Sequence, residues 1–238
     1  MTGFMDALGF LTVLGGPRPL SPAAQRWFPV IGAIVGLVVG IVWWGAAHVL
    51  PAAPAAVVAV AADLLLTGML HFDGLLDSAD GLLPHLDRNR RLEVMREPTV
   101  GAFAVTVAAL VILARWSGLT VLRPAPLLLI GLWAASRSVA VVALNRLAPA
   151  RPDGLATTFA AKGEGALGVL GLAASGALAV TWDPLYGAVA LLSGLAAAGS
   201  ILLLSVRRLG GITGDTLGAA IVAFETFALL AATAVRPR

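Results

Sequence analysis

The sequence predicts an all-α fold: a polytopic integral membrane helical bundle of about seven transmembrane helices, with an additional N-terminal interfacial helix. Apolar residues make up 59% of the 238 residues, and charged residues make up 12%, about half of the roughly 25% usual in soluble domains. The mean hydropathy is +0.93. A chain this apolar could not cover its surface with polar groups in water, so a soluble enzyme and a disordered chain are excluded. We expect one domain, 1–238.

Seven segments are apolar enough to cross a membrane, which takes about 20 residues of α-helix. In chain order they are 27–50, 52–70, 101–122, 125–148, 166–181, 185–206 and 216–235. In the first segment, Gly32, Gly36 and Gly40 recur at four-residue spacing, which favours close helix packing.

The N-terminal part, 1–26, contains an apolar stretch at 3–15 that is too short to span and ends at Gly-Gly-Pro. It lacks the basic start and the small-residue cleavage site of a signal peptide. We therefore interpret it as a helix lying at the membrane interface.

The basic residues orient the bundle. Of the sixteen Lys and Arg residues, eleven fall on one side of the membrane and three on the other, so the first side is predicted to be cytoplasmic. These basic loops, and not a nucleic-acid partner, explain the pI near 10.5. With no Cys in the chain, disulfides, a thiolate nucleophile and Cys-based zinc sites are excluded. The eleven are Arg18, Arg26, Arg88, Arg90, Arg91, Arg96, Arg146, Arg151, Lys162, Arg207 and Arg208; the three are Arg123, Arg236 and Arg238.

A cluster of carboxylates opens the cytoplasmic segment 71–100. On a helix continuing from the second span, Asp73, Asp77 and Asp80 share a stripe about 60° wide. Unpaired anions so close repel one another, so a cation or protonation is needed. Hard oxygen ligands without Cys suit Mg²⁺ or Mn²⁺. The alternative is a solvated helix end with the acids facing water.

His71 precedes this stripe and lies about 160° away from it on a regular helix. It is a candidate general base, and a packed or capping imidazole is the alternative. Downstream, 87–97 is predicted to form a short amphipathic helix. Its Arg90 and Arg91 could hold phosphates through paired hydrogen bonds or could only meet anionic lipid headgroups.

A glycine-rich loop, 207–218, leads into the last span. Such a loop at a helix N-terminus directs free N–H groups and a positive dipole end at an anion, which makes Gly211, Thr213 and Gly214 candidate phosphate ligands. Asp215 could add a metal ligand or serve as the N-cap of the span.

Four ionisable residues lie within the spans, where they are costly and normally face a cavity or one another. Arg137 and Glu225 lie deepest, and both are candidate substrate-binding residues. Asp63 and Arg115 also qualify, but each is a single residue without a motif.

Several of these segments together resemble the cobalamin synthase family, the adenosylcobinamide-GDP ribazoletransferases. The likeness covers nearly the whole chain in order. The chain departs from it at 96–98, Arg-Glu-Pro, where members tend to have Lys-Asp-Ser, and at Val222, where an acid or amide is common. The matching segments are 28–32, 71–81, 90–95, 100–103 and 210–219, together with Glu225.

The resemblance implies a phosphoryl-group transfer in which adenosylcobinamide-GDP and α-ribazole, or its 5′-phosphate, give adenosylcobalamin, or its phosphate, and GMP. It implies Mg²⁺ as cofactor, held by Asp73, Asp77, Asp80 and Asp215, with His71 and the first three acids as catalytic residues. The expected place is the bacterial inner membrane, with the site on the cytoplasmic face; the sequence also leaves room for a homo-oligomer. Substrate would be bound by Arg90, Arg91, Arg137, Gly211, Thr213, Gly214, Asp215 and Glu225.

Two other functions remain open. A membrane CDP-alcohol phosphotransferase also uses a stripe of Asp residues, but at a different spacing, so the likeness is an analogy only. An ion-coupled transporter would suit the buried charges and the glycine-broken last span, although the acidic stripe lies at the end of a span and the chain shows no internal repeat.

Overall fold

The structure is a computed structural model that describes residues 2–16, 21–159 and 164–234, and within these ranges it is helical without any strand. Four of the basic residues counted above (Arg18, Lys162, Arg236 and Arg238) lie outside these ranges, as does 235 at the end of the seventh expected span. The helices are α1 Thr2–Leu11, η1 Pro22–Trp27, α2 Phe28–Val49, α3 Ala52–Leu66, α4 Leu70–Leu82, α5 Arg88–Val94, α6 Ala102–Val121, α7 Pro126–Arg146, α8 Leu155–Phe159, α9 Gly165–Trp182, α10 Pro184–Leu209 and α11 Gly214–Ala234.

Six stretches of the described chain are long and apolar enough to cross a membrane, namely η1–α2, α6, α7, α9, α10 and α11, and the bent pair α3–α4 makes a seventh if counted as one span. The outer helices present large apolar side chains outwards, such as Leu110 on α6, Leu170 on α9 and Leu192 on α10, each more than 60% exposed. An apolar exterior of this kind is covered by lipid in a membrane protein. The predicted polytopic membrane bundle is confirmed.

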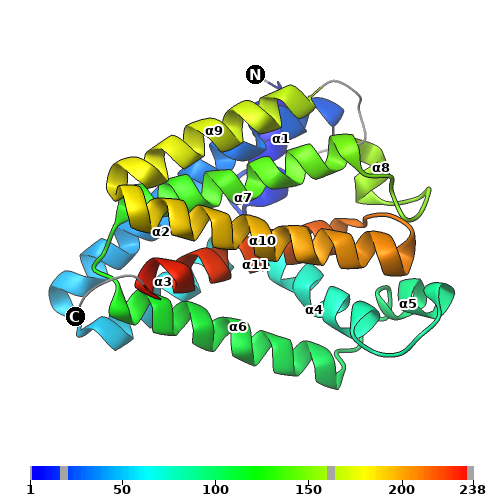
Figure 1. The fold of residues 1–238 in the computed structure, drawn as a ribbon, viewed down its shortest axis with the longest axis horizontal. Coiled ribbons are helices and arrows are strands. Elements are labelled where there is room, and N and C mark those ends of the chain that lie inside the picture. The colour runs from blue at the N-terminus through cyan, green and yellow to red at the C-terminus, as the bar shows by residue number, and fades with distance from the viewer. Residues whose placement is uncertain (1, 17–20, 160–163, 235–238) are drawn as a thin grey trace.

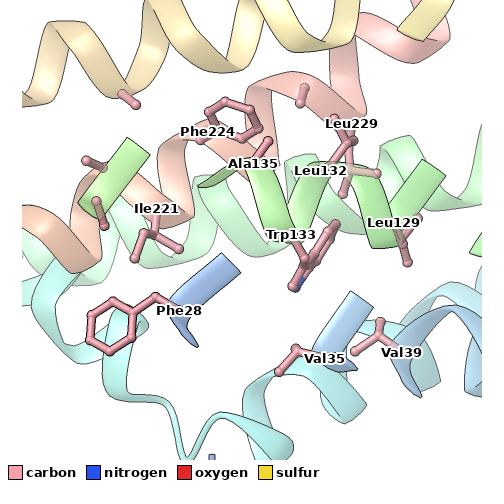
Figure 2. Close-up of a cluster of buried hydrophobic side chains, with 14 of the residues drawn as sticks. Phe28, Val35, Val39, Leu129, Leu132, Trp133, Ala135, Ile221, Phe224 and Leu229 are labelled. Atoms are coloured by element: carbon pink, nitrogen blue, oxygen red, sulfur yellow. The ribbon is translucent and has the colours of Figure 1, made fainter. Parts of the chain in front are cut away.

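Helices α7 and α11 form the centre of the bundle (Figure 1), and each is buried over most of its length. Figure 2 shows where they meet α2: Trp133 and Leu129 of α7 lie opposite Val35 and Val39 of α2, and Phe224 of α11 lies close to Ala135 of α7. These side chains belong to one continuous apolar core.

The glycine stripe of α2 packs as predicted. A Cβ atom added at Gly32, Gly36 or Gly40 would collide with backbone atoms of α7, at Trp133, Leu129 and Pro126 respectively. The three glycines therefore let two helices approach more closely than any larger residue allows.

The N-terminal helix α1 is part of the bundle. Ala7 and Leu11 on it are almost fully buried and belong to the same core as α2. The expected interfacial helix is thus packed against protein on this face, which places its side chains within reach of the site described below.

The prediction that the acidic stripe continues the second span as one helix is wrong. The chain bends by 89° between α3 and α4, with Gly68 and Met69 both in the left-handed region at φ 57°. The hydroxyl of Thr67 donates to the carbonyl of Asp63 at 2.8 Å and closes the end of α3. As a result, α4 is too short to cross the membrane by itself and is not one of the six spanning helices. Its acids lie at the end of the bundle.

Candidate active site

The acidic helix α4 lies at one end of the molecule, together with α5, α8 and the turn between α10 and α11 (Figure 1). Its contact with α11 is made backbone to backbone. A Cβ at Gly74 would lie 2.8 Å from the carbonyl oxygen of Asp215, and one at Gly218 would lie 3.1 Å from the Cα of His71. These two glycines bring the acids of α4 beside the first turn of α11.

The stripe of acids borders a cavity. Asp73, Asp77 and Asp80 line one side of it, and the loop 95–100 lines the other. Burial and the carboxylates of Asp215, Asp73 and Asp80 raise the pKa of Asp77 to about 7, against the opposing charge of Arg151. Burial and the neighbouring carboxylates thus oppose ionisation of Asp77, and a cation bound beside it would favour its charged form.

Asp80 has a partner of its own. Its Oδ2 accepts the backbone N–H of Gly101 at 2.6 Å, and its Oδ1 accepts that of Ala104 at 3.0 Å. It therefore ties the end of α4 to the N-terminus of α6, where an acid is favoured. Among the described residues, no three His, Asp or Glu side chains stand together as a ready metal cluster, so the four predicted ligands are not preassembled.

We expect Asp80→Asn to lower the free energy of unfolding by about 1–2 kcal/mol. An amide has one oxygen, so one of the two N–H groups of α6 loses its acceptor. The matched change Asp73→Asn should leave stability level or raise it, because it relieves repulsion. Thermal unfolding in detergent without divalent cations compares the two, and equal losses would contradict the capping role of Asp80.

Two arginines that the motifs did not single out stand near the acids. Arg151 pairs with Asp215 at 2.8 Å, and its Nε is buried without a hydrogen-bond partner among the described residues. Arg96 pairs with the exposed Asp153 at 3.0 Å and borders both the carboxylate cavity and a second opening formed by Arg151, Asp215 and Gly214. Arg96 directly follows the matching segment 90–95, at a position where the chain departs from the family pattern, and Arg151 lies in a loop without any pattern.

The two arginines of 87–97 that the sequence proposed as phosphate ligands make contacts with other residues of the protein. Arg90 is exposed and pairs with Glu93 and Glu97 of its own segment. Arg91 is buried and donates to the carbonyls of Gly81 and Leu82 at 2.8 and 2.9 Å, where it satisfies the C-terminal end of α4. The structure does not bring either guanidinium to the carboxylate cavity.

The glycine-rich loop is placed partly as expected. Thr213, and not Asp215, caps α11: its hydroxyl accepts the N–H of Thr216 at 3.1 Å, and Thr216 accepts the N–H of Thr213 at 2.9 Å. Gly211 packs tightly against the backbone at 148–150, which is a structural contact. Gly214 and Asp215 face the cavities of the site.

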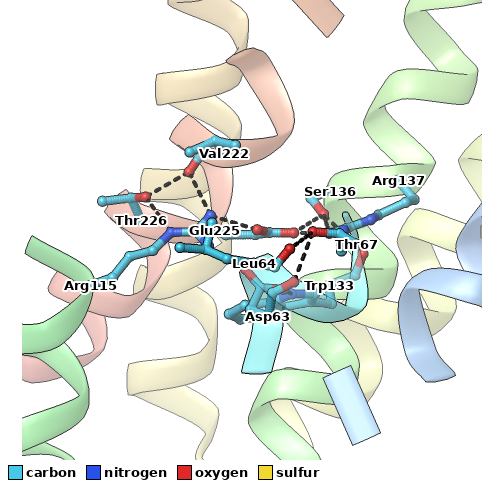
Figure 3. A network of polar contacts seen from close by, with 10 residues as sticks. All are labelled: Asp63, Leu64, Thr67, Arg115, Trp133, Ser136, Arg137, Val222, Glu225 and Thr226. Atoms are coloured by element: carbon cyan, nitrogen blue, oxygen red, sulfur yellow. Dashed lines mark hydrogen bonds and ion pairs between the residues drawn. The ribbon is translucent and has the colours of Figure 1, made fainter. Parts of the chain in front are cut away.

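Arg137 and Glu225 form a buried ion pair (Figure 3), and neither residue lines the carboxylate cavity. Arg115 joins them, 2.7 Å from Glu225 and 2.5 Å from Asp63. The expectation that buried charges face one another is confirmed. The four residues come from α7, α11, α6 and α3, so the network ties four helices together.

This network leaves the predicted substrate role of Arg137 and Glu225 without support, because each is about 1% exposed. Trp133 and Ser136 complete it by donating to Asp63 at 2.8 Å and to Glu225 at 2.9 Å. The cavity beside the network is about 10 Å³, room for about one water molecule. This cavity beside the charges therefore has no room for a substrate.

Comparison with known proteins places the sequence in a family. The model of the cobalamin-5-phosphate synthase family matches residues 3–233. The chain belongs to this family. The predicted resemblance is thereby confirmed. The matched residues include α4, the 210–219 loop and all four charged residues of the buried network.

Curated relatives agree over nearly the whole length. A protein of Mesorhizobium japonicum named adenosylcobinamide-GDP ribazoletransferase is 39% identical, over 88% of this chain and 83% of its own. Proteins of the same name from Bradyrhizobium diazoefficiens and Escherichia coli O157:H7 are 35% and 36% identical, each over 96% of this chain and over 92% and 98% of their own length. No solved structure matches the chain.

Proposed function

We propose that this member of the cobalamin-5-phosphate synthase family is an adenosylcobinamide-GDP ribazoletransferase. Its substrates would be adenosylcobinamide-GDP and α-ribazole, or the 5′-phosphate of the latter. The observation that carries the proposal is the gathering of Asp73, Asp77 and Asp215 with Arg96 and Arg151 around two openings that share Arg96, at one end of the bundle. Carboxylates beside guanidinium groups suit a metal-bridged diphosphate.

In the proposed reaction, a hydroxyl oxygen of α-ribazole forms a bond to the cobinamide-linked phosphorus. The bond between that phosphorus and the bridging oxygen breaks, and GMP leaves with the bridging oxygen. Arg96 and Arg151 would bind diphosphate oxygens and hold the two phosphates in line with the attacking oxygen. His71, which lines a cavity together with Asp73 and Asp215, would accept the hydroxyl proton.

The residues present fit Mg²⁺. This ion is commonly held by one or two carboxylates and completed by water and substrate phosphates, so a preassembled cluster is not required. Asp73 and Asp77, one turn apart on α4, would hold it, and Asp215 could join when its partner Arg151 turns to the substrate. Asp80 is the least suited of the four predicted ligands because α6 occupies both its oxygens. When bound, the ion would neutralise charge on the diphosphate and on the departing phosphate.

The test is the product balance of the purified protein in detergent. With adenosylcobinamide-GDP, α-ribazole and Mg²⁺, we expect one GMP for each corrinoid product, and neither product when α-ribazole or the divalent cation is left out. Release of CMP from a CDP-activated lipid, with no turnover of cobinamide-GDP, would instead support the phosphotransferase alternative.

We further propose that the site opens to the cytoplasm from a bacterial inner membrane. Because the chain contains no Cys, single substitutions give clean labelling sites: His85→Cys beside α4, and Arg123→Cys between α6 and α7, both at exposed positions. A membrane-impermeant maleimide added to spheroplasts should label only the Arg123→Cys variant. In inverted vesicles the pattern should reverse, and labelling of His85→Cys from outside would contradict the orientation.

A further inference from the structure

A second cavity, here called the aromatic pocket, shares Asp73 with the carboxylate cavity, and residues 95–100 are not among the described residues that line it. Its apolar end is lined by the rings of Phe10, Phe28 and Phe159, and by Ala140, Leu144 and Ile221. These residues come from α1, α2, α8, α7 and α11, so helices far apart in the sequence converge to build it. Phe10, Phe28 and Phe159 are not part of the carboxylate site already described.

The three rings contact one another and form a continuous wall. Phe10 and Phe28 are stacked with centroids 5.9 Å apart, and Phe159 lies 5.3 Å from each of them, inclined at 50° and 73°. Such an arrangement offers both a ring face and ring edges to a further aromatic group, which is a favourable surface for a flat ring.

The other end of the pocket is polar. Asp73, His71 and Asp215 line it, together with Gly214 in the first turn of α11. A molecule that fills the pocket therefore needs a flat apolar part at one end and hydroxyl or phosphate groups at the other. An acyl chain alone is apolar, but it is not flat and carries no hydroxyl or phosphate group.

We propose that the aromatic pocket binds the benzimidazole base of α-ribazole, with the ribose directed to Asp73 and Asp215. The inference rests on the proposed function and assigns a place to its acceptor substrate. The cavity is about 200 Å³, which suits a bicyclic base and is far too small for a corrin ring. The corrinoid would then approach from the opposite side of the acids, where the 95–100 loop lies.

The test separates the two substrates by their KM values in Phe10→Leu and Phe159→Leu. Leucine keeps an apolar side chain and removes the ring, so stacking is lost while the helix packing is largely kept. We expect KM for α-ribazole to rise about fivefold or more, with KM for adenosylcobinamide-GDP unchanged within about twofold. Phe4→Leu is the matched control, since Phe4 is on the same helix as Phe10 but packs on Trp27; both of its KM values should remain as in the wild type.

A variant that fills the aromatic pocket tests the same proposal by blocking the pocket. Ala140→Leu places a larger side chain in the pocket without removing any ring, and it should raise KM for α-ribazole about tenfold or more. It should also abolish the rise in melting temperature that α-ribazole alone produces in the wild type. That binding measurement needs neither the second substrate nor turnover.

The outcomes are distinct. If the wild type forms product but all three pocket variants keep the wild-type KM for α-ribazole, the pocket is not its site, and the proposed function still stands. The pocket is also not the α-ribazole site if Ala140→Leu raises the melting temperature and leaves KM for α-ribazole unchanged. That result would indicate a lipid or detergent tail in the pocket, and the proposed function would still stand. If the wild type forms no product, the proposed function fails, and an α-ribazole-induced stabilisation that is lost in Ala140→Leu would still support the pocket.

Discussion

Asp73→Asn and Asp77→Asn are each expected to reduce turnover by about 100-fold or more. Both changes remove a negative charge and keep the shape of the side chain. The opposite face of α4, with Gly74, Leu75 and Ser78, carries the packing, so both variants should insert and purify as the wild type does. Without divalent cations their melting temperature should stay level or rise, because repulsion along the stripe is relieved.

The same variants should lose much of the increase in melting temperature that Mg²⁺ produces, as linkage requires when the binding site is weakened. Glu93→Gln is the control, because Glu93 is an acid on the same side of the membrane, 65% exposed and paired with Arg90 at the surface. It should keep wild-type turnover within about twofold, as expected for a surface ion pair. Wild-type turnover in both aspartate variants would show that the stripe is a solvated helix end.

Glu225→Ala is expected to give the largest loss of stability, about 3–5 kcal/mol in the free energy of unfolding. The change leaves Arg115 and Arg137 buried without their shared carboxylate. Glu164→Ala is the comparison, because its ion pair with Arg26 lies at the surface, and its loss should stay below about 1 kcal/mol.

A double-mutant cycle tests whether this loss comes from the ion pair. Arg137→Leu combined with Glu225→Leu should be less destabilising than the sum of the two single changes, since the pair is removed together. Unfolding in mixed micelles measures all three variants. If Glu225→Gln retained full stability and instead raised KM, the residue would bind substrate as the sequence had suggested.

The bundle could be predicted because membrane spans depend on local composition. Hydropathy alone located α6, α7, α9, α10 and α11, and the spacing of Gly32, Gly36 and Gly40 identified the face on which α2 packs. The bend before α4 could not be predicted in this way. It depends on two consecutive left-handed residues, and Met69 carries no conformational preference that indicates one.

Those parts of the site that depend on helical spacing could be predicted from the sequence. Those that depend on tertiary contacts could not. The spacing of Asp73, Asp77 and Asp80 placed three acids on one face, but only the fold shows that Asp80 caps α6. Arg91 carries the same charge as Arg151, and only tertiary contacts show that Arg91 holds a helix end while Arg151 reaches Asp215.

The buried network illustrates the same limit. Asp63 and Arg115 each stand alone in the sequence, 52 residues apart, and they meet at 2.5 Å only when α3 and α6 pack side by side. Pairing of this kind is a property of the packed helices. It cannot be derived from a pattern within either span.

The central claim is that the acids of α4 hold a divalent cation against the diphosphate of the substrate. Mn²⁺ in place of Mg²⁺ allows the most direct measurement, the ³¹P coupling in the electron–nuclear double resonance spectrum of the protein with adenosylcobinamide-GDP. We expect phosphorus coupling in the wild type and in Glu93→Gln, and its loss in Asp77→Asn at the same Mn²⁺ concentration. An unchanged ³¹P coupling in a protein carrying both Asp73→Asn and Asp77→Asn would contradict the account.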